Sequence, residues 1–273
     1  MSEASNLHKS ARNMLKATSR TFFIPISYLP SGLREAVSSA YLCMRAIDEI
    51  EDHPQLQLET KHNLLHAISL LLKKPFNNQE LMTLFHPYHN LLPEVTLRFG
   101  DWINLCPPTI VENISNATST MAKGMADWVL KEWRIQTEED LNEYTFYVAG
   151  LVGVMLSDIW KWYDDVETDK DLAIAFGRGL QSVNILRNHA EDLERGVDFF
   201  PDGWELEDMY RYARRNLALG DGYLEDIKPG PILNFCKIPI ALAHGTLDAL
   251  TEGKEKMSRA AVIKIVSQVV NRK

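Results

Sequence analysis

The sequence predicts an all-α fold, which we expect to form one domain over residues 1–273. Apolar residues recur at helical spacing along most of the chain. Alternating apolar runs closed by Asn-Gly or Asp-Gly turns, which mark β-hairpins, do not occur in it. Most Pro residues fall between the helical stretches or near their ends. These observations favour long central helices joined by short connections.

The individual helices can be placed from the breaks and caps around them. The first helix, Asn6–Ala17, ends before the Pro-containing break Phe22–Pro25. Ser31 then caps a long helix, Gly32–Glu51, which Pro54 closes. Further helices are expected at Leu58–Lys73, Asn78–His86, Leu91–Asn104, Pro108–Trp133, Glu138–Trp162, Asp171–Arg195, Glu205–Leu219, Pro231–Leu250 and Arg259–Asn271.

Composition and charge narrow the class of protein. With 45% hydrophobic and 24% charged residues, the chain resembles an ordinary soluble protein. Its formal net charge of −8 argues against nucleic acid as a partner but allows a phosphorylated small molecule. Cys43, Cys106 and Cys236 are far apart, which favours reduced, buried thiols. Neither a signal core nor a membrane-spanning stretch is found, so we expect a cytoplasmic protein with at most peripheral membrane contact.

A first acid-bearing segment lies at the end of the helix expected over Gly32–Glu51. Its polar residues share one helical stripe, since they follow at spacings of three or four: Tyr41, Arg45, Asp48, Glu51 and Asp52. Carboxylate oxygens suit Mg²⁺, and an Arg guanidinium can hold a phosphate. Acids near a helix C-terminus oppose the helix dipole, so they lie there at a cost. The alternative explanation is a solvated helix end.

A second polar segment follows about 140 residues later. Gln181, Asn184, Asn188 and Asp192 recur on one helix face, beside apolar residues. The alternative explanation is a polar stripe between packed helices. Two such segments facing each other would let divalent cations bridge protein acids and a diphosphate, and so promote loss of pyrophosphate from an allylic substrate.

Six motifs occur in a fixed order along the chain: Ser19–Phe23, Tyr41–Asp52, Met121–Met125, Tyr144–Gly153, Gln181–Asp192, and Phe235–Pro239 with Ala243–Leu247. Tyr144–Gly153 is the most specific of them. Together the motifs resemble those of the squalene/phytoene synthase family of head-to-head prenyl transferases, and within it the squalene synthase-like proteins. The resemblance spans most of the chain. It implies the isoprenoid synthase fold, a helical bundle around a central apolar cavity.

The resemblance also implies roles for particular residues. Those expected to hold metal are Asp48, Glu51, Asp52, Asn188 and Asp192. Those expected to bind substrate are Ser19, Arg20, Tyr41, Arg45, Gln181, Asn184 and Arg187. Catalytic roles fall to Asp48, Asp52 and Tyr144, whose phenol would face the reacting carbons. For Tyr144 the alternative is a core tyrosine with a bonded hydroxyl.

The implied reaction joins two allylic diphosphates, with farnesyl diphosphate as the expected substrate and a presqualene diphosphate or squalene-type product. Mg²⁺ is the expected metal, with Mn²⁺ as an alternative, and a reductase or cyclase would act downstream. NADPH is not favoured, because Lys254, Lys256 and Arg259 do not match the family's spacing and a GxGxxG motif is missing from the sequence.

One position departs from the family pattern. Asn188 stands where an aspartate is expected, so the second motif lacks one carboxylate. This keeps other functions open: a hydrolase that releases a prenyl alcohol, a terpene cyclase or transferase to another acceptor, and a non-catalytic assembly or binding protein. Erosion of both acidic motifs would mark the last class, whereas here the first motif is complete.

Overall fold

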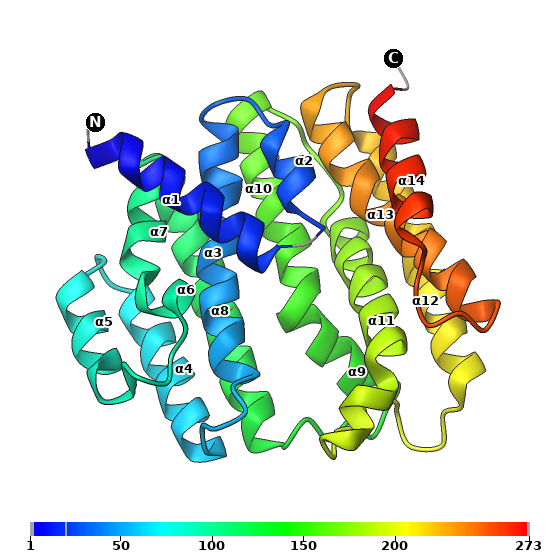
Figure 1. Ribbon diagram of the computed structural model, residues 1–273, viewed down its shortest axis with the longest axis horizontal. Helices are drawn as coiled ribbons and strands as arrows, with labels where there is room; N and C mark the ends of the chain where they lie inside the picture. Colours follow the sequence, from blue (N-terminus) through cyan, green and yellow to red (C-terminus); the bar gives the residue numbers. More distant parts are fainter. Residues whose placement is uncertain (1–2, 20, 272–273) are drawn as a thin grey trace. The chain divides into compact units, whose positions relative to one another are not determined.

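The computed structural model describes residues 3–19 and 21–271, and helices are the only regular elements within them (Figure 1). The all-α prediction is therefore confirmed. The chain divides into two compact units, Met1–Glu132 and Trp133–Lys273. The single domain over 1–273 and the central apolar cavity stay predictions.

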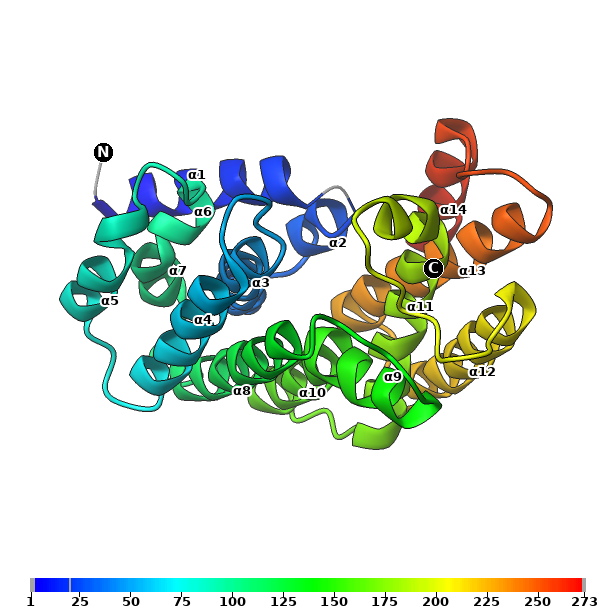
Figure 2. The same ribbon diagram turned by 90° about the horizontal axis from the view of Figure 1, so that it is seen from below.

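In the first unit, α3 is the central helix. It packs against α1, α2, α4, α6, α7 and α8 (Figures 1 and 2). Leu33, Leu42 and Ile47 on α3 have no exposed surface, so this helix is held by apolar packing along its length. The helices of this unit are α1 (Glu3–Thr18), α2 (Phe23–Ser27), α3 (Leu33–Glu51), α4 (Leu58–Leu72), α5 (Asn78–Phe85), α6 (Glu94–Leu97), α7 (Phe99–Leu105) and α8 (Val111–Leu130), with a 3₁₀ turn at His86–Tyr88.

In the second unit, α11 has the same central place. It packs against α9, α10, α12 and α13 and against a π-helical turn, Phe146–Gly150 (Figure 1). The large side chains of Trp160, Tyr212 and Tyr223 are fully buried around it. The helices of this unit are α9 (Glu138–Thr145), α10 (Leu151–Asp164), α11 (Lys170–Glu194), α12 (Leu206–Tyr223), α13 (Pro231–Thr251) and α14 (Arg259–Asn271), with a 3₁₀ turn at Leu224–Asp226.

Two glycines bring α11 very close to the chain before it. A Cβ at Gly153 would lie 2.1 Å from the Ala173 carbonyl oxygen, and one at Gly177 would lie 2.2 Å from the Ala149 carbonyl oxygen. Both obstacles are backbone atoms, which cannot move aside as a flexible side chain can. A side chain at either position would prevent this close approach.

Three expected boundaries are wrong. The helix expected over Glu138–Trp162 is interrupted by the π-helical turn, where Ala149 packs against α11. The helix expected over Leu91–Asn104 breaks at Arg98, whose φ of −98° and ψ of 20° are not helical. The expected break at Phe22–Pro25 contains α2, because Pro25 falls in the first turn, where a missing N–H costs nothing.

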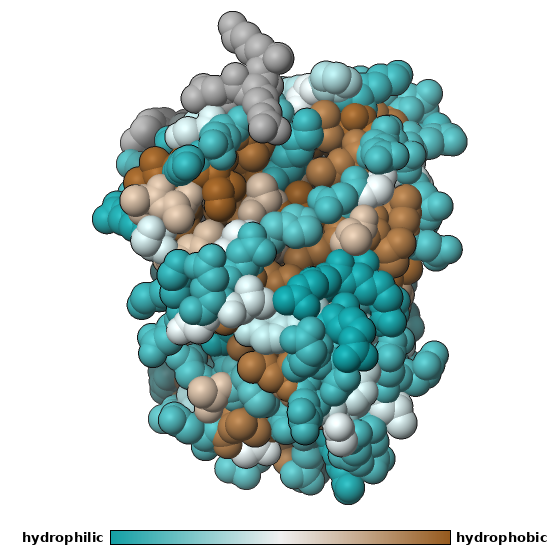
Figure 3. Space-filling model, turned by 90° about the vertical axis from the view of Figure 1, so that its right-hand side faces the viewer, coloured by the Kyte–Doolittle hydropathy of each residue, from teal (hydrophilic) through white to brown (hydrophobic). Residues whose placement is uncertain are grey.

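The expectation for the cysteines is confirmed, since Cys43, Cys106 and Cys236 are free and buried. Among residues 3–19 and 21–271, no helix combines the length and apolarity needed to cross a membrane. The face of the second unit seen in Figure 3 carries hydrophobic patches between hydrophilic side chains. Exposed Leu206, Leu219 and Ile263 belong to the helices of this unit.

Candidate functional site

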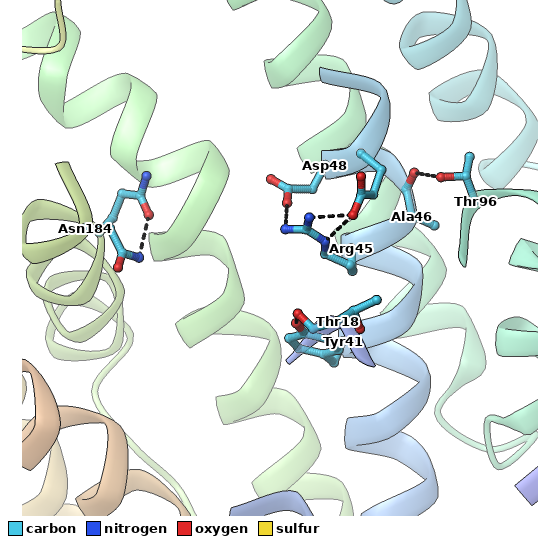
Figure 4. Close-up of polar contacts among 9 residues, drawn as sticks. Thr18, Tyr41, Arg45, Ala46, Asp48, Thr96 and Asn184 are labelled. Atoms are coloured by element: carbon cyan, nitrogen blue, oxygen red, sulfur yellow. Dashed lines mark hydrogen bonds and ion pairs between the residues drawn. The ribbon is translucent and has the colours of Figure 1, made fainter. Parts of the chain in front are cut away.

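Ser19 and Tyr41 meet at the turn between α1 and α2. The Tyr41 hydroxyl donates to the Thr18 carbonyl at 3.0 Å (Figure 4). The Phe22 N–H donates to Ser19 Oγ at 2.9 Å. Burial raises the pKa of Tyr41, although its hydrogen bond with Ser19 acts in the opposite direction. Arg20, the expected diphosphate ligand between these residues, lies outside the described residues.

Arg45, one turn further along α3, is held by two acids of its own helix. Its Nη1 lies 2.6 Å from Asp48 Oδ2, and its Nε donates to Glu49 Oε1 at 2.9 Å (Figure 4). All three side chains are about one third exposed, so water and a ligand can reach them. An anionic phosphate would compete with these carboxylates for the guanidinium.

Asp48 is electrostatically unfavourable as a carboxylate. Desolvation by the surrounding chain, followed by repulsion from Asp52, raises its pKa to about 7, against the opposing effect of Arg45. Asp52 is the C-terminal capping position of α3 and is exposed. Two carboxylates therefore stand on one helix face, at the end of the helix where the dipole is negative.

Glu51 differs from these two acids. It is only 3% exposed, and the buried Lys61 donates to its backbone carbonyl at 2.6 Å. Glu51 therefore faces the interior of the first unit, whereas Asp48 and Asp52 reach its surface. Asp48 and Asp52 are therefore the carboxylates of the first motif that a metal ion can reach.

The carboxylates of the first motif, Asp48 and Asp52, are suitable ligands for a divalent cation. A cation would offset the desolvation and the repulsion from Asp52 that raise the pKa of Asp48. Mg²⁺ prefers carboxylate oxygens, with water and phosphate oxygens completing its shell. In the part of the chain that the structure describes, no three His, Cys, Asp or Glu side chains form a ready cation cage. Substrate phosphates and water would therefore have to supply most of the coordination.

The second motif is built differently, because its polar groups already bond to one another. On α11, Asn184 Nδ2 lies 3.5 Å from Gln181 Oε1, at the outer limit of a hydrogen bond (Figure 4). Arg187 Nε donates to Asn188 Oδ1 at 3.2 Å. The one atom of Asn188 that could ligate a cation is thus engaged by a positive side chain.

Asp192 is also paired within the protein. Its side chain is 8% exposed and accepts a hydrogen bond from Arg195, one turn later on α11. Buried carboxylates need such a partner. A cation at Asp192 would have to compete with Arg195, so this position fits a metal less well than the pair Asp48 and Asp52.

Tyr144 belongs to the last turn of α9 and is 6% exposed. Its ring stacks on that of Phe199, with centroids 4.9 Å apart and planes at 18°. The π-helical turn begins two residues later, and such turns often occur at functional sites. The stacking fixes the ring plane of Tyr144.

Sequence reasoning missed two ion pairs that shape these motifs. Glu49 pairs with Arg45, and Arg195 pairs with Asp192. Both could have been found from spacing, because Glu49 is four residues after Arg45 and Arg195 is three after Asp192.

Comparison with known proteins gives the setting for this geometry. A family model described as squalene/phytoene synthase matches residues 15–206. A squalene synthase of Schizosaccharomyces pombe is 30% identical over 95% of this chain and 64% of its own length. One of Dictyostelium discoideum is 31% identical over 86% of this chain and 62% of its own length. The ligand complex of TcSQS shares the fold, with a TM-score of 0.79 over 97% of this chain and 86% of that chain at 21% identity.

The match covers only part of the curated relatives. The chain spans somewhat less than two thirds of the length of these two curated relatives.

Proposed function

The chain belongs to the squalene/phytoene synthase family, and from this premise we propose that it is a Mg²⁺-dependent prenyl transferase. It condenses two allylic prenyl diphosphates head to head, with farnesyl diphosphate as substrate and a presqualene diphosphate or squalene-type product. The observation that supports this proposal best is the pair of accessible carboxylates, Asp48 and Asp52, beside Arg45 on α3.

The residues divide the work as follows. Asp48 and Asp52 would hold Mg²⁺, which when bound supplies positive charge to the leaving pyrophosphate. Arg45 would exchange its intramolecular carboxylates for a diphosphate oxygen. Tyr41, with Ser19, would orient the diphosphate at the α1–α2 turn.

The residues of the second unit would act on the second substrate. Gln181, Asn184 and Arg187 offer amide and guanidinium hydrogen bonds to a diphosphate. Asp192 and the amide oxygen of Asn188 would bind a cation if Arg195 and Arg187 gave way. Tyr144, held flat against Phe199, would present its ring to an allylic cation.

The test is incubation of purified protein with farnesyl or geranylgeranyl diphosphate, with and without Mg²⁺ and NADPH, followed by mass spectrometry of the products. A C30 or C40 product that requires Mg²⁺ is expected. Mn²⁺ should substitute in part, and NADPH should not be required for consumption of substrate. Protein that leaves both diphosphates intact in the presence of Mg²⁺ would contradict the proposal.

Hydrolysis is the second candidate, and the second motif favours it. Asn188 carries no charge and Asp192 is paired with Arg195, so this motif attracts cations less than the first. If the site ionises one prenyl diphosphate but binds the second one poorly, water would capture the allylic carbocation in place of the second substrate. Farnesol as the only product would identify this reaction.

We place the protein in the cytoplasm, because its three cysteines are free and buried, as in reducing compartments. A reductase or cyclase would then receive its product, and any membrane contact would be peripheral.

A further inference from the structure

A cavity lies in the first unit, away from the acidic motif at the end of α3. It measures about 470 Å³, within the range of about 300–1,000 Å³ that small-molecule sites occupy. Its walls come from α1, α2, the first turns of α3 and one residue of α7, and α1 and α2 both contact α3 (Figures 1 and 2). Glu35 in its wall precedes Asp48 by 13 positions on α3, about 20 Å along the helix axis.

The wall of this cavity has two chemically distinct parts. The apolar part consists of Ala11, Leu15, Phe23, Ile26 and Leu105. The charged part has three permanent cations against one carboxylate, and these are Lys9, Arg12, Arg34 and Glu35. The cavity is thus positive in a chain whose net charge is −8.

The one carboxylate is fully used by the protein itself. Glu35 accepts from the Gly32 N–H and from Arg34 at 3.1 Å, and His8 Nδ1 lies 3.5 Å from it. Burial would raise the pKa of Glu35, but the Gly32 bond and Arg34 outweigh it and lower the pKa. Glu35 therefore stays ionised and fixes Arg34 and His8 at the cavity wall.

The cations on α1 are not balanced in this way. Within the described residues, neither Lys9 nor Arg12 forms an ion pair, although Arg12 lies 6.0 Å from the Phe23 ring centroid. Ser38 also lines the cavity and contributes a hydroxyl to its wall. Such a hydroxyl can donate a hydrogen bond to an anion bound there.

We propose that this cavity binds an amphiphilic anion, with a phosphate or carboxylate head at Lys9, Arg12 and Ser38 and a short apolar body against Leu15 and Ile26. Neither half of the cavity alone accounts for such a ligand. The cations and the hydroxyl recognise the head, and the apolar wall excludes a fully hydrophilic anion. The inference is independent of the reaction proposed above.

Calorimetric titration of the full chain without Mg²⁺ tests the proposal. Octyl phosphate and octanoate, each below its micelle concentration, represent the two head groups. At least one should bind with a one-to-one stoichiometry, about tenfold more tightly than octanol or inorganic phosphate. Octanol binding as tightly as both anions would overturn the proposal, as would binding of the protein to phosphatidylglycerol vesicles but to neither monomeric amphiphile.

Variants locate the site. The double variant Lys9→Gln/Arg12→Gln should weaken binding about tenfold, and Ser38→Ala a fewfold. Lys16→Gln is the matched control, because Lys16 is exposed on α1 outside the cavity. Asp48→Asn should leave this binding unchanged, which separates it from the acidic motif. Unchanged binding in both the double variant and Ser38→Ala, or its loss in Asp48→Asn, would place the ligand elsewhere.

Discussion

Near the end of α3, Asp48 shares its helix face with a second carboxylate, Asp52, whereas near the end of α11 the buried Asp192 is paired with Arg195. Both helices are the central helices of their units, and both carry polar residues at helical spacing. The α3 motif concentrates negative charge that the protein does not neutralise completely. In the α11 motif, the negative charge of Asp192 is neutralised by Arg195. Similar spacing of polar residues on a helix can therefore produce either an excess of negative charge or a balanced ion pair.

The largest expected effect comes from Asp48→Asn. If the α3 motif holds the cation, Mg²⁺-dependent consumption of farnesyl diphosphate should fall about 100-fold, as expected for a loss of several kcal/mol of charge stabilisation. The free energy of unfolding at neutral pH should rise rather than fall, because Asn removes the desolvation and repulsion that raise the pKa of Asp48, and the lost pair with Arg45 is partly exposed.

Glu49→Gln is the matched control for this variant, since Glu49 also pairs with Arg45. Its activity should stay within a fewfold of the parent protein. Equal losses in Asp48→Asn and Glu49→Gln would mean that pairing with Arg45, and not cation binding, is the role of Asp48.

The next effect is a pH dependence that only the α3 motif should show. With the pKa of Asp48 near 7, its proton must leave before a cation binds, so Mg²⁺ affinity should rise about tenfold from pH 6 to pH 8. Without Mg²⁺, the stability of the fold should change in the opposite direction to the Mg²⁺ affinity as the pH rises. The folded protein keeps a proton that the unfolded chain loses near pH 4, so stability falls as pH rises from 4 towards 7.

Calorimetric Mg²⁺ titrations and thermal melts across this pH range measure both trends. Asp48→Asn should abolish the two trends together. A Mg²⁺ affinity that does not change between pH 6 and pH 8 would remove Asp48 from the cation site.

Asp192→Asn should show the reverse pattern to Asp48→Asn. Because Asp192 is buried and paired, its replacement should reduce the free energy of unfolding by about 1–3 kcal/mol, measured by urea denaturation. Activity of the folded fraction should fall about tenfold at most. Arg195→Gln should reproduce much of the stability loss, and full stability in both variants would show that the pair is not structural.

Asn188→Asp should produce the smallest change and make the two motifs more alike. The added carboxylate should tighten Mg²⁺ binding at α11 about fivefold and raise the ratio of coupled product to prenyl alcohol. Asn184→Asp, one turn earlier on the same helix, is the control for charge alone. A larger gain in Asn184→Asp than in Asn188→Asp would argue against Asn188 as a ligand position.

The sequence predicted the elements whose signals are local and missed those set by packing. α3 and α11 were placed within a few residues, because their apolar spacing and caps lie within the helices. The π-helical turn at Phe146–Gly150 was missed, since the local spacing of apolar residues does not indicate an added residue at the contact with α11.

The same distinction holds for the candidate site. The stripe of Arg45, Asp48 and Asp52 follows from spacing, and the structure places all three on α3 near its end. The burial of Glu51 does not follow from spacing, because it depends on Lys61 and the helices that surround α3. Spacing shows which residues share a helix, and only packing shows which of them face water.

The π-helical turn has one more consequence, for the phase of the helices on either side. Each residue advances a helix by about 100°, so one inserted residue rotates everything that follows by that angle relative to what precedes it. Tyr144 lies before the turn and is oriented by Phe199, whereas Gly153 lies after it and is oriented by Ala173. The direction of the Tyr144 contact relative to the Gly153 contact therefore differs by about 100° from what an uninterrupted helix would give.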